Sequence, residues 1–175
     1  MPRFASETIV PVEKSRAEIE ETLRRYGAEE FQSGWKQDAA MIGFRLKDLF
    51  VRFILPFPSI KERRFTHKKI RGYERPMSDL QRTRAYEQEL RSRWRALLLV
   101  IKAKLEAVEC QISSMEQEFL AFIVMPNQMT IGDWIIEKGL PQIRAGEMPT
   151  LLALPAPESS NDNDQVIDAE FEEKK

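Results

Sequence analysis

An α+β fold is predicted for this chain of 175 residues, with one domain over residues 1–154 and an acidic tail over residues 155–175. Short runs of β-forming residues lie between two segments that have the apolar spacing of helices, and the last residues are polar and acidic. The expected order is an N-terminal helix, a three-stranded antiparallel β-meander packed against a long helix, two or more short helices and a disordered tail.

The N-terminal helix is expected to begin at Ser15 and to end near Tyr26. Ser15 and Glu18 have the spacing of a capping box, in which each side chain bonds a free backbone N–H of the first turn. Ile19 and Leu23 lie four residues apart and therefore share one face. The sequence predicts a short helix with one apolar side.

Three strands are predicted between residues 30 and 55. The three runs, in order, are FQSGWKQ, AAMIGFRL and LFVRFIL. Two-residue polar breaks separate them, at Gln37-Asp38 and Lys47-Asp48, and such breaks are typical of an antiparallel meander. Pro56 ends the third strand because proline cannot donate a backbone hydrogen bond to a neighbouring strand.

A long helix is predicted from Ser78 to about Glu109, after a basic flexible loop over residues 59–77 that has no apolar periodicity. Ser78 and Gln81 form a second potential capping box. The segment Ala96–Ile101 is apolar all round, so we expect it to be buried from several sides. Shorter helices are predicted to follow, the first capped by Ser113 with Glu116 and the second by Thr130 with Asp133.

Charge is unevenly distributed along the chain, although the net charge is only −1. Residues 1–43 carry six basic and eight acidic side chains, and residues 44–104 carry seventeen basic and six acidic ones, a local net of +11. Residues 105–175 carry four basic and fourteen acidic side chains, a local net of −10. This asymmetry indicates a polyanionic partner, pairing between the two regions, or two solvated faces.

The basic region is the strongest functional signal, because aromatic residues lie among its cations. Arginine suits phosphate contacts, since its planar group offers several donors and keeps its charge. The candidates for phosphate contacts are Arg63, Arg64, Lys68, Lys69, Arg71, Arg91 and Arg95. The candidates for stacking on bases are Trp35, Phe65 and Tyr73. The alternatives are a solvated loop, and for Trp35 packing on the covered face of the sheet.

Catalysis is not expected, because the sequence lacks the residues that most enzyme sites need. His67 is the only histidine and is interpreted as an exposed loop residue, which leaves no serine or cysteine triad with an imidazole base. No phosphate-binding glycine motif is present, and one cysteine with one histidine cannot form a structural zinc site. Cys110 is predicted to be a small buried apolar residue. We therefore expect no enzyme activity, no metal and no cofactor, with a carboxylate-based nuclease as a distant alternative.

The N-terminus has no apolar run long enough for a signal peptide, and the longest apolar run, Ala96–Ile101, is too short to span a membrane. A cytoplasmic protein without membrane contact is therefore expected. The acidic tail contains three apolar residues, Val166, Ile167 and Phe171, which are candidates for binding a protein partner or for competing with nucleic acid. The alternative is a tail that only increases solubility.

Two long stretches resemble an uncharacterised protein family common in phages, prophages and some bacteria. They are VEKSRAEIEETLRRYGAEEF with the following AMIGFRLKDLFVRFILPFP, and WRALLLVIKAKLEAVECQISSMEQEFLAFIVMP. The order of a helix, a meander and a long helix is similar to the core of ring-forming single-strand annealing proteins of phages, and VIDAEF resembles the acidic tails of phage recombination proteins. The resemblance implies a mobile-element setting and transfers no residue role.

The leading hypothesis is a non-catalytic nucleic-acid-binding protein of a phage or mobile element. It would bind single-stranded DNA, or anneal it, in recombination or replication, and would be a homo-oligomer. The alternative is an oligomeric protein-interaction module, such as an assembly factor or an inhibitor of a host defence enzyme. In that case the basic surface would meet an acidic protein.

Overall fold

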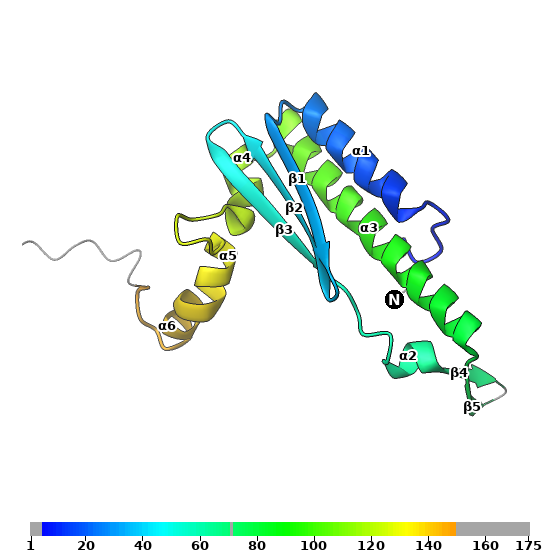
Figure 1. Ribbon diagram of the computed structural model, residues 1–175. Coiled ribbons are helices and arrows are strands. Elements are labelled where there is room, and N and C mark those ends of the chain that lie inside the picture. The colour runs from blue at the N-terminus through cyan, green and yellow to red at the C-terminus, as the bar shows by residue number, and fades with distance from the viewer. Residues whose placement is uncertain (1–4, 71, 150–175) are drawn as a thin grey trace, which may run out of the picture.

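The computed structural model describes residues 5–70 and 72–149 and confirms the predicted α+β class (Figure 1). The elements in chain order are α1 (Val12–Arg25), β1 (Glu30–Lys36), β2 (Ala39–Leu46), β3 (Leu49–Pro56), α2 (Arg63–Thr66), β4 (His67–Ile70), β5 (Tyr73–Pro76), α3 (Asp79–Glu109), α4 (Met115–Phe119), η1 (Leu120–Phe122), α5 (Ile131–Trp134), η2 (Ile135–Gly139) and α6 (Leu140–Arg144). Arg71 and the tail candidates Val166, Ile167 and Phe171 lie outside the described residues.

The predicted meander is confirmed as a sheet of order β1-β2-β3 with antiparallel pairing throughout. Both turns contain the two residues predicted from the sequence, and Lys47 takes a left-handed φ of 54° in the second. Alternate residues of the strands point to one face, which is apolar and buried over most of its area. This face carries Ala40, Ile42, Phe44, Leu46, Val51 and Phe53.

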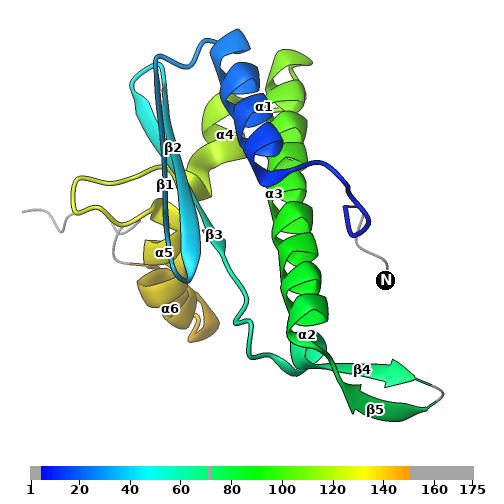
Figure 2. The ribbon, with the colours of Figure 1, turned by 45° about the vertical axis from the view of Figure 1, so that its right-hand side comes forward.

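Helices α1 and α3 lie side by side and cover this face of the sheet (Figures 1 and 2). Their shared core residues include Ile19 and Leu23 from α1 and Leu98 and Ile101 from α3, all fully buried. A bond from Arg95 Nη1 to Glu18 Oε2, 2.7 Å long, also joins the two helices. The long helix therefore supports both α1 and the sheet.

Two of the predicted helix starts are correct and two are displaced. Ser78 with Gln81 forms the expected capping box, and the Thr130 side chain accepts a hydrogen bond from the Asp133 backbone N–H. The predicted start at Ser15 is wrong, because α1 begins at Val12 and Ser15 lies fully buried inside it. The next capping box is formed by Ser114 with Gln117, one residue later than predicted.

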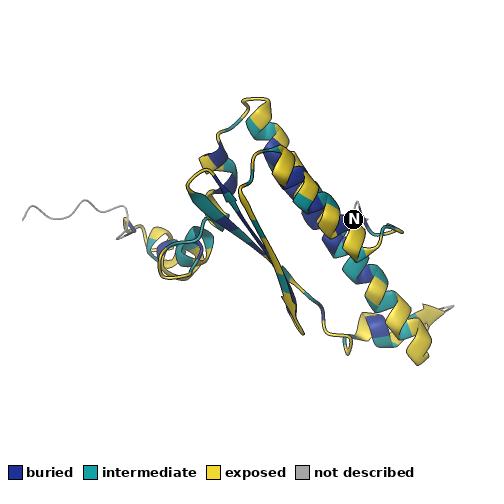
Figure 3. Ribbon diagram, turned by 45° about the horizontal axis from the view of Figure 1, so that its top comes forward, coloured by how far each residue is buried: buried dark blue, intermediate teal, exposed yellow. Residues whose placement is uncertain are grey.

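Two burial predictions are wrong, and both concern α3. Cys110 is exposed, because it is the C-terminal cap residue of α3 and lies beyond the buried stripe. Ala96 and Val100 are also exposed, and they line one apolar groove on α3. Figure 3 shows that exposed residues alternate with buried ones along this helix. The helix therefore retains an uncovered apolar strip. No helix within residues 5–70 and 72–149 has the length and apolar character needed to cross a membrane.

Candidate nucleic-acid interface

The segment predicted as a loop over residues 59–77 contains regular structure, which corrects that prediction. Phe65 of α2 is only 3% exposed and meets Tyr86 of α3 edge to face, with 5.5 Å between ring centroids. This contact fixes α2 against α3. Phe65 therefore has no free ring face for a nucleobase, and the prediction that it stacks on bases is withdrawn.

Strands β4 and β5 form an antiparallel pair that projects beyond the N-terminal end of α3 (Figure 2). Lys68 faces Arg75 and Ile70 faces Tyr73 across the pair. Gly72, in the connection, has a φ of 88°, which glycine adopts without the steric cost that a side chain would bring. Because side chains alternate between faces, these four residues share one face, which we name the cationic face.

The cationic face has unbalanced positive charge. Lys68 and Arg75 are directly opposite each other, and like charges in that position destabilise a strand pair. Within the described part of the chain neither cation forms an ion pair, and the face itself carries no carboxylate. Tyr73 is 77% exposed beside them. The cationic face thus presents two unpaired cations and an accessible aromatic ring side by side.

The opposite face of the pair differs in that it carries a carboxylate, Glu74, beside its cations. Arg63 of α2 donates two hydrogen bonds to the Glu74 carboxylate, and Glu74 lies across from Lys69. The hydrogen bonds and positive charge of Arg63 hold the pKa of Glu74 below its usual value. The exposed His67 also lies here, as expected for a surface histidine, with Nδ1 3.0 Å from the Thr66 hydroxyl. Arg63 is therefore occupied by a partner within the chain.

The other predicted arginines do not form a free row along α3. Arg64 bonds to Glu62 at 2.7 Å and lies over the Phe65 ring, with its guanidinium carbon 4.7 Å from the centroid. Arg91 bonds to the side-chain oxygen of Gln88 at 2.7 Å. Arg95 bonds to Glu18, as described above. These contacts give the arginines structural roles that their spacing in the sequence did not reveal.

Two cations that were not among the predicted site residues are better placed. Arg75 lies opposite Lys68, and Arg84 is exposed on the second turn of α3 without an ion pair in the described residues. The signal that could have identified Arg75 is the stretch Ile-Arg-Gly-Tyr at residues 70–73, in which two bulky residues flank an Arg-Gly break.

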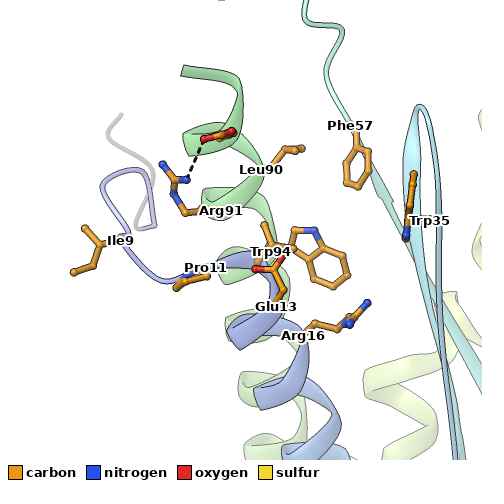
Figure 4. Close-up of a pocket in the computed structure, with 11 residues that line it drawn as sticks. Ile9, Pro11, Glu13, Arg16, Trp35, Phe57, Leu90, Arg91 and Trp94 are labelled. Carbon is orange, nitrogen blue, oxygen red and sulfur yellow. Dashed lines mark ion pairs between the residues drawn. The ribbon is translucent and has the colours of Figure 1, made fainter. Parts of the chain in front are cut away.

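A second feature is a cleft of about 500 Å³ between the helices and the end of the sheet that carries the β1–β2 turn (Figure 4). Trp35 of β1 and Phe57 form one wall, and Leu90 and Trp94 of α3 form the other. Trp35 is on the helix-facing side of the sheet, as its pairing with the buried Ala40 shows, yet it is 79% exposed. The alternative interpretation of Trp35 as a packed residue is therefore wrong.

The N-terminal segment forms the remaining edge of this aromatic cleft. Gln88 of α3 donates hydrogen bonds to the carbonyls of Ser6 and Thr8, at 3.0 and 2.8 Å, and these bonds hold the segment in place. Among the charged groups at the cleft, Arg91 forms an ion pair with Glu87, 3.9 Å away, whereas Arg16 extends from α1 toward the sheet (Figure 4).

No group of three or more potential metal ligands occurs among residues 5–70 and 72–149. No protein-family model, curated protein or solved structure matches this chain. The phage setting and the similarity to annealing proteins therefore stay predictions.

Proposed function

We propose that this protein binds nucleic acid through the cationic face, prefers single strands and catalyses no reaction. The observation that carries this proposal is the pair Lys68 and Arg75, opposite each other beside the exposed ring of Tyr73. The role fits a cytoplasmic protein of a phage or mobile element that acts in recombination or replication.

A polyanion would supply the negative charge that the cationic face lacks. The two cations repel each other in the free protein, and a phosphate between them would turn that repulsion into two attractions. Tyr73 lies within the same pair and would stack on a base next to the bound phosphate. Arg84 of α3 and Lys61, both exposed, extend the positive charge away from the β4–β5 pair.

Binding should depend strongly on salt. We expect a labelled oligothymidylate to bind at about 50 mM salt and to lose roughly a thousandfold in affinity at about 200 mM, if six or more phosphates are contacted. Fluorescence anisotropy at both salt concentrations, with single- and double-stranded oligonucleotides, measures this effect. The duplex should bind more weakly, because its bases cannot reach an aromatic side chain. Absence of binding to either oligonucleotide at 50 mM would contradict the proposal.

A second candidate function, self-association, has its own observation. The exposed side of α3 carries an apolar groove of about 590 Å³, lined by Ala96, Leu99, Val100 and Ala103. If a second copy packs antiparallel about the midpoint of Leu99 and Val100, each Ala96 faces Ala103 of the second copy. The same pairing brings Arg93 near Glu106 of the second copy, two residues of opposite charge.

Replacement of Val100 by lysine is expected to convert a dimer into a monomer, because it puts a charge at the centre of this contact. Light scattering coupled to size-exclusion chromatography measures the mass. Since Val100 is exposed in the single chain, thermal stability of the dilute protein should change little. A wild-type protein that is already monomeric at high concentration would rule out this second function.

A further inference from the structure

We propose that the aromatic cleft receives an unpaired nucleobase of a strand whose phosphates lie on the cationic face. This inference rests on the proposed function and extends it, because it assigns a base-binding site apart from the β4–β5 pair. It also gives a structural reason for a preference for single strands.

The walls of the cleft suit a flat aromatic ligand. Trp35 and Phe57 lie on the sheet side, and the indole of Trp94 faces them from α3 (Figure 4). Trp94 is almost fully buried, so its position is fixed by the core. The face of Trp35 is open to solvent. A nucleobase stacked there would cover apolar surface that no described residue covers.

The charges at the cleft favour an uncharged ring over a phosphate. Two arginines, Arg16 and Arg91, are balanced by two carboxylates, Glu13 and Glu87. A phosphate inside the cleft would therefore meet as many negative as positive groups. A base carries no charge at neutral pH, and its edge can bond with either kind of group. Arg16, which extends from α1 toward the sheet at the edge of the cleft, would contact the phosphate that follows the base.

The position of the cleft permits one strand to use both surfaces. Trp35 is in β1 just before the β1–β2 turn, and this turn lies at the same end of the molecule as α2 and the β4–β5 pair (Figures 1 and 2). Residues 57–62 connect the two regions directly. A single strand can turn one base into the cleft and continue to the cationic face, whereas paired bases in a duplex cannot leave their stack without an energetic cost.

The test compares two ligands with the same phosphates: oligothymidylate of about 20 nucleotides and an abasic deoxyribose-phosphate strand of equal length. We expect Trp35→Ala to weaken oligothymidylate binding by about 5- to 100-fold and to leave abasic-strand binding unchanged. The wild type should quench its tryptophan fluorescence on binding oligothymidylate, and Trp35→Ala should lose most of that quenching. Trp35→Phe should retain part of the affinity.

Ile54→Ala is the matched control, because Ile54 is an exposed apolar residue on the other face of the same sheet. It should bind both strands as the wild type does. The inference is wrong if Trp35→Ala binds oligothymidylate normally, or if it weakens both strands equally. Those results would leave nucleic-acid binding itself intact. A wild-type protein that binds neither strand would instead contradict the proposed function together with this inference.

Discussion

Replacement of Phe119 by alanine is expected to lower the free energy of unfolding by about 3–5 kcal/mol, the largest effect on stability that we expect from one substitution. Phe119 is completely buried. Its ring meets Phe44 and Phe53 edge to face, with centroid distances of 5.9 and 6.3 Å. Because these neighbours belong to two different strands, they cannot both move in to fill the cavity that alanine leaves.

Urea denaturation followed by circular dichroism measures this loss. Leu120→Ala is the control, since Leu120 is the next residue and is 46% exposed, and we expect it to cost less than about 1 kcal/mol. Phe119→Leu should fall between the two, because leucine keeps much of the buried volume. Equal stabilities of Phe119→Ala and Leu120→Ala would show that α4 does not complete the core.

The parts of the fold that the sequence predicts best are those in which one local pattern determines the structure. In LFVRFIL, every second residue points to the same side of β3. That side packs toward the helices, and Val51 and Phe53 are buried on it. Ser78 and Gln81 define the start of α3 because a capping box requires only residues three positions apart. Neither feature depends on distant segments.

The parts that the sequence did not predict depend on contacts between distant segments. Arg95 bonds to Glu18, which lies 77 residues away, and no periodicity of α3 could distinguish this bond from a phosphate site. Phe65 was predicted to be accessible because charged residues surround it, but Tyr86 buries it. The β4–β5 pair was missed because four-residue strands rich in lysine and arginine lack the apolar alternation of a strand.

The candidate site differs from its prediction for the same reason. Of the predicted residues, four keep an exposed or partly exposed position without a competing ion pair in the described part of the chain: Lys68, Lys69, Tyr73 and Trp35. Arg63 and Arg64, by contrast, are held by Glu74 and Glu62. The sequence indicated the region of the candidate site, but which cations are free and which form ion pairs depends on the pairing of the strands.

The double substitution Lys68→Ala with Arg75→Ala is expected to have the largest effect on nucleic-acid binding. If each cation contacts one phosphate of a single strand, the slope of log affinity against log salt should become less steep by about 1.4. Anisotropy titrations at several salt concentrations measure the slope. The control is Lys14→Ala with Lys138→Ala, which removes the same charge from α1 and η2, away from the β4–β5 pair, and should leave the slope nearly unchanged.

Stability distinguishes a binding role of these cations from a structural one. Lys68 and Arg75 repel each other in the free protein, so replacing both by alanine should leave the midpoint of urea unfolding unchanged or slightly higher. A structural role would lower that midpoint together with the affinity. Reduced affinity in a protein of undiminished stability would show that the two cations are maintained for a polyanion. An unchanged salt slope would mean that the phosphates bind elsewhere.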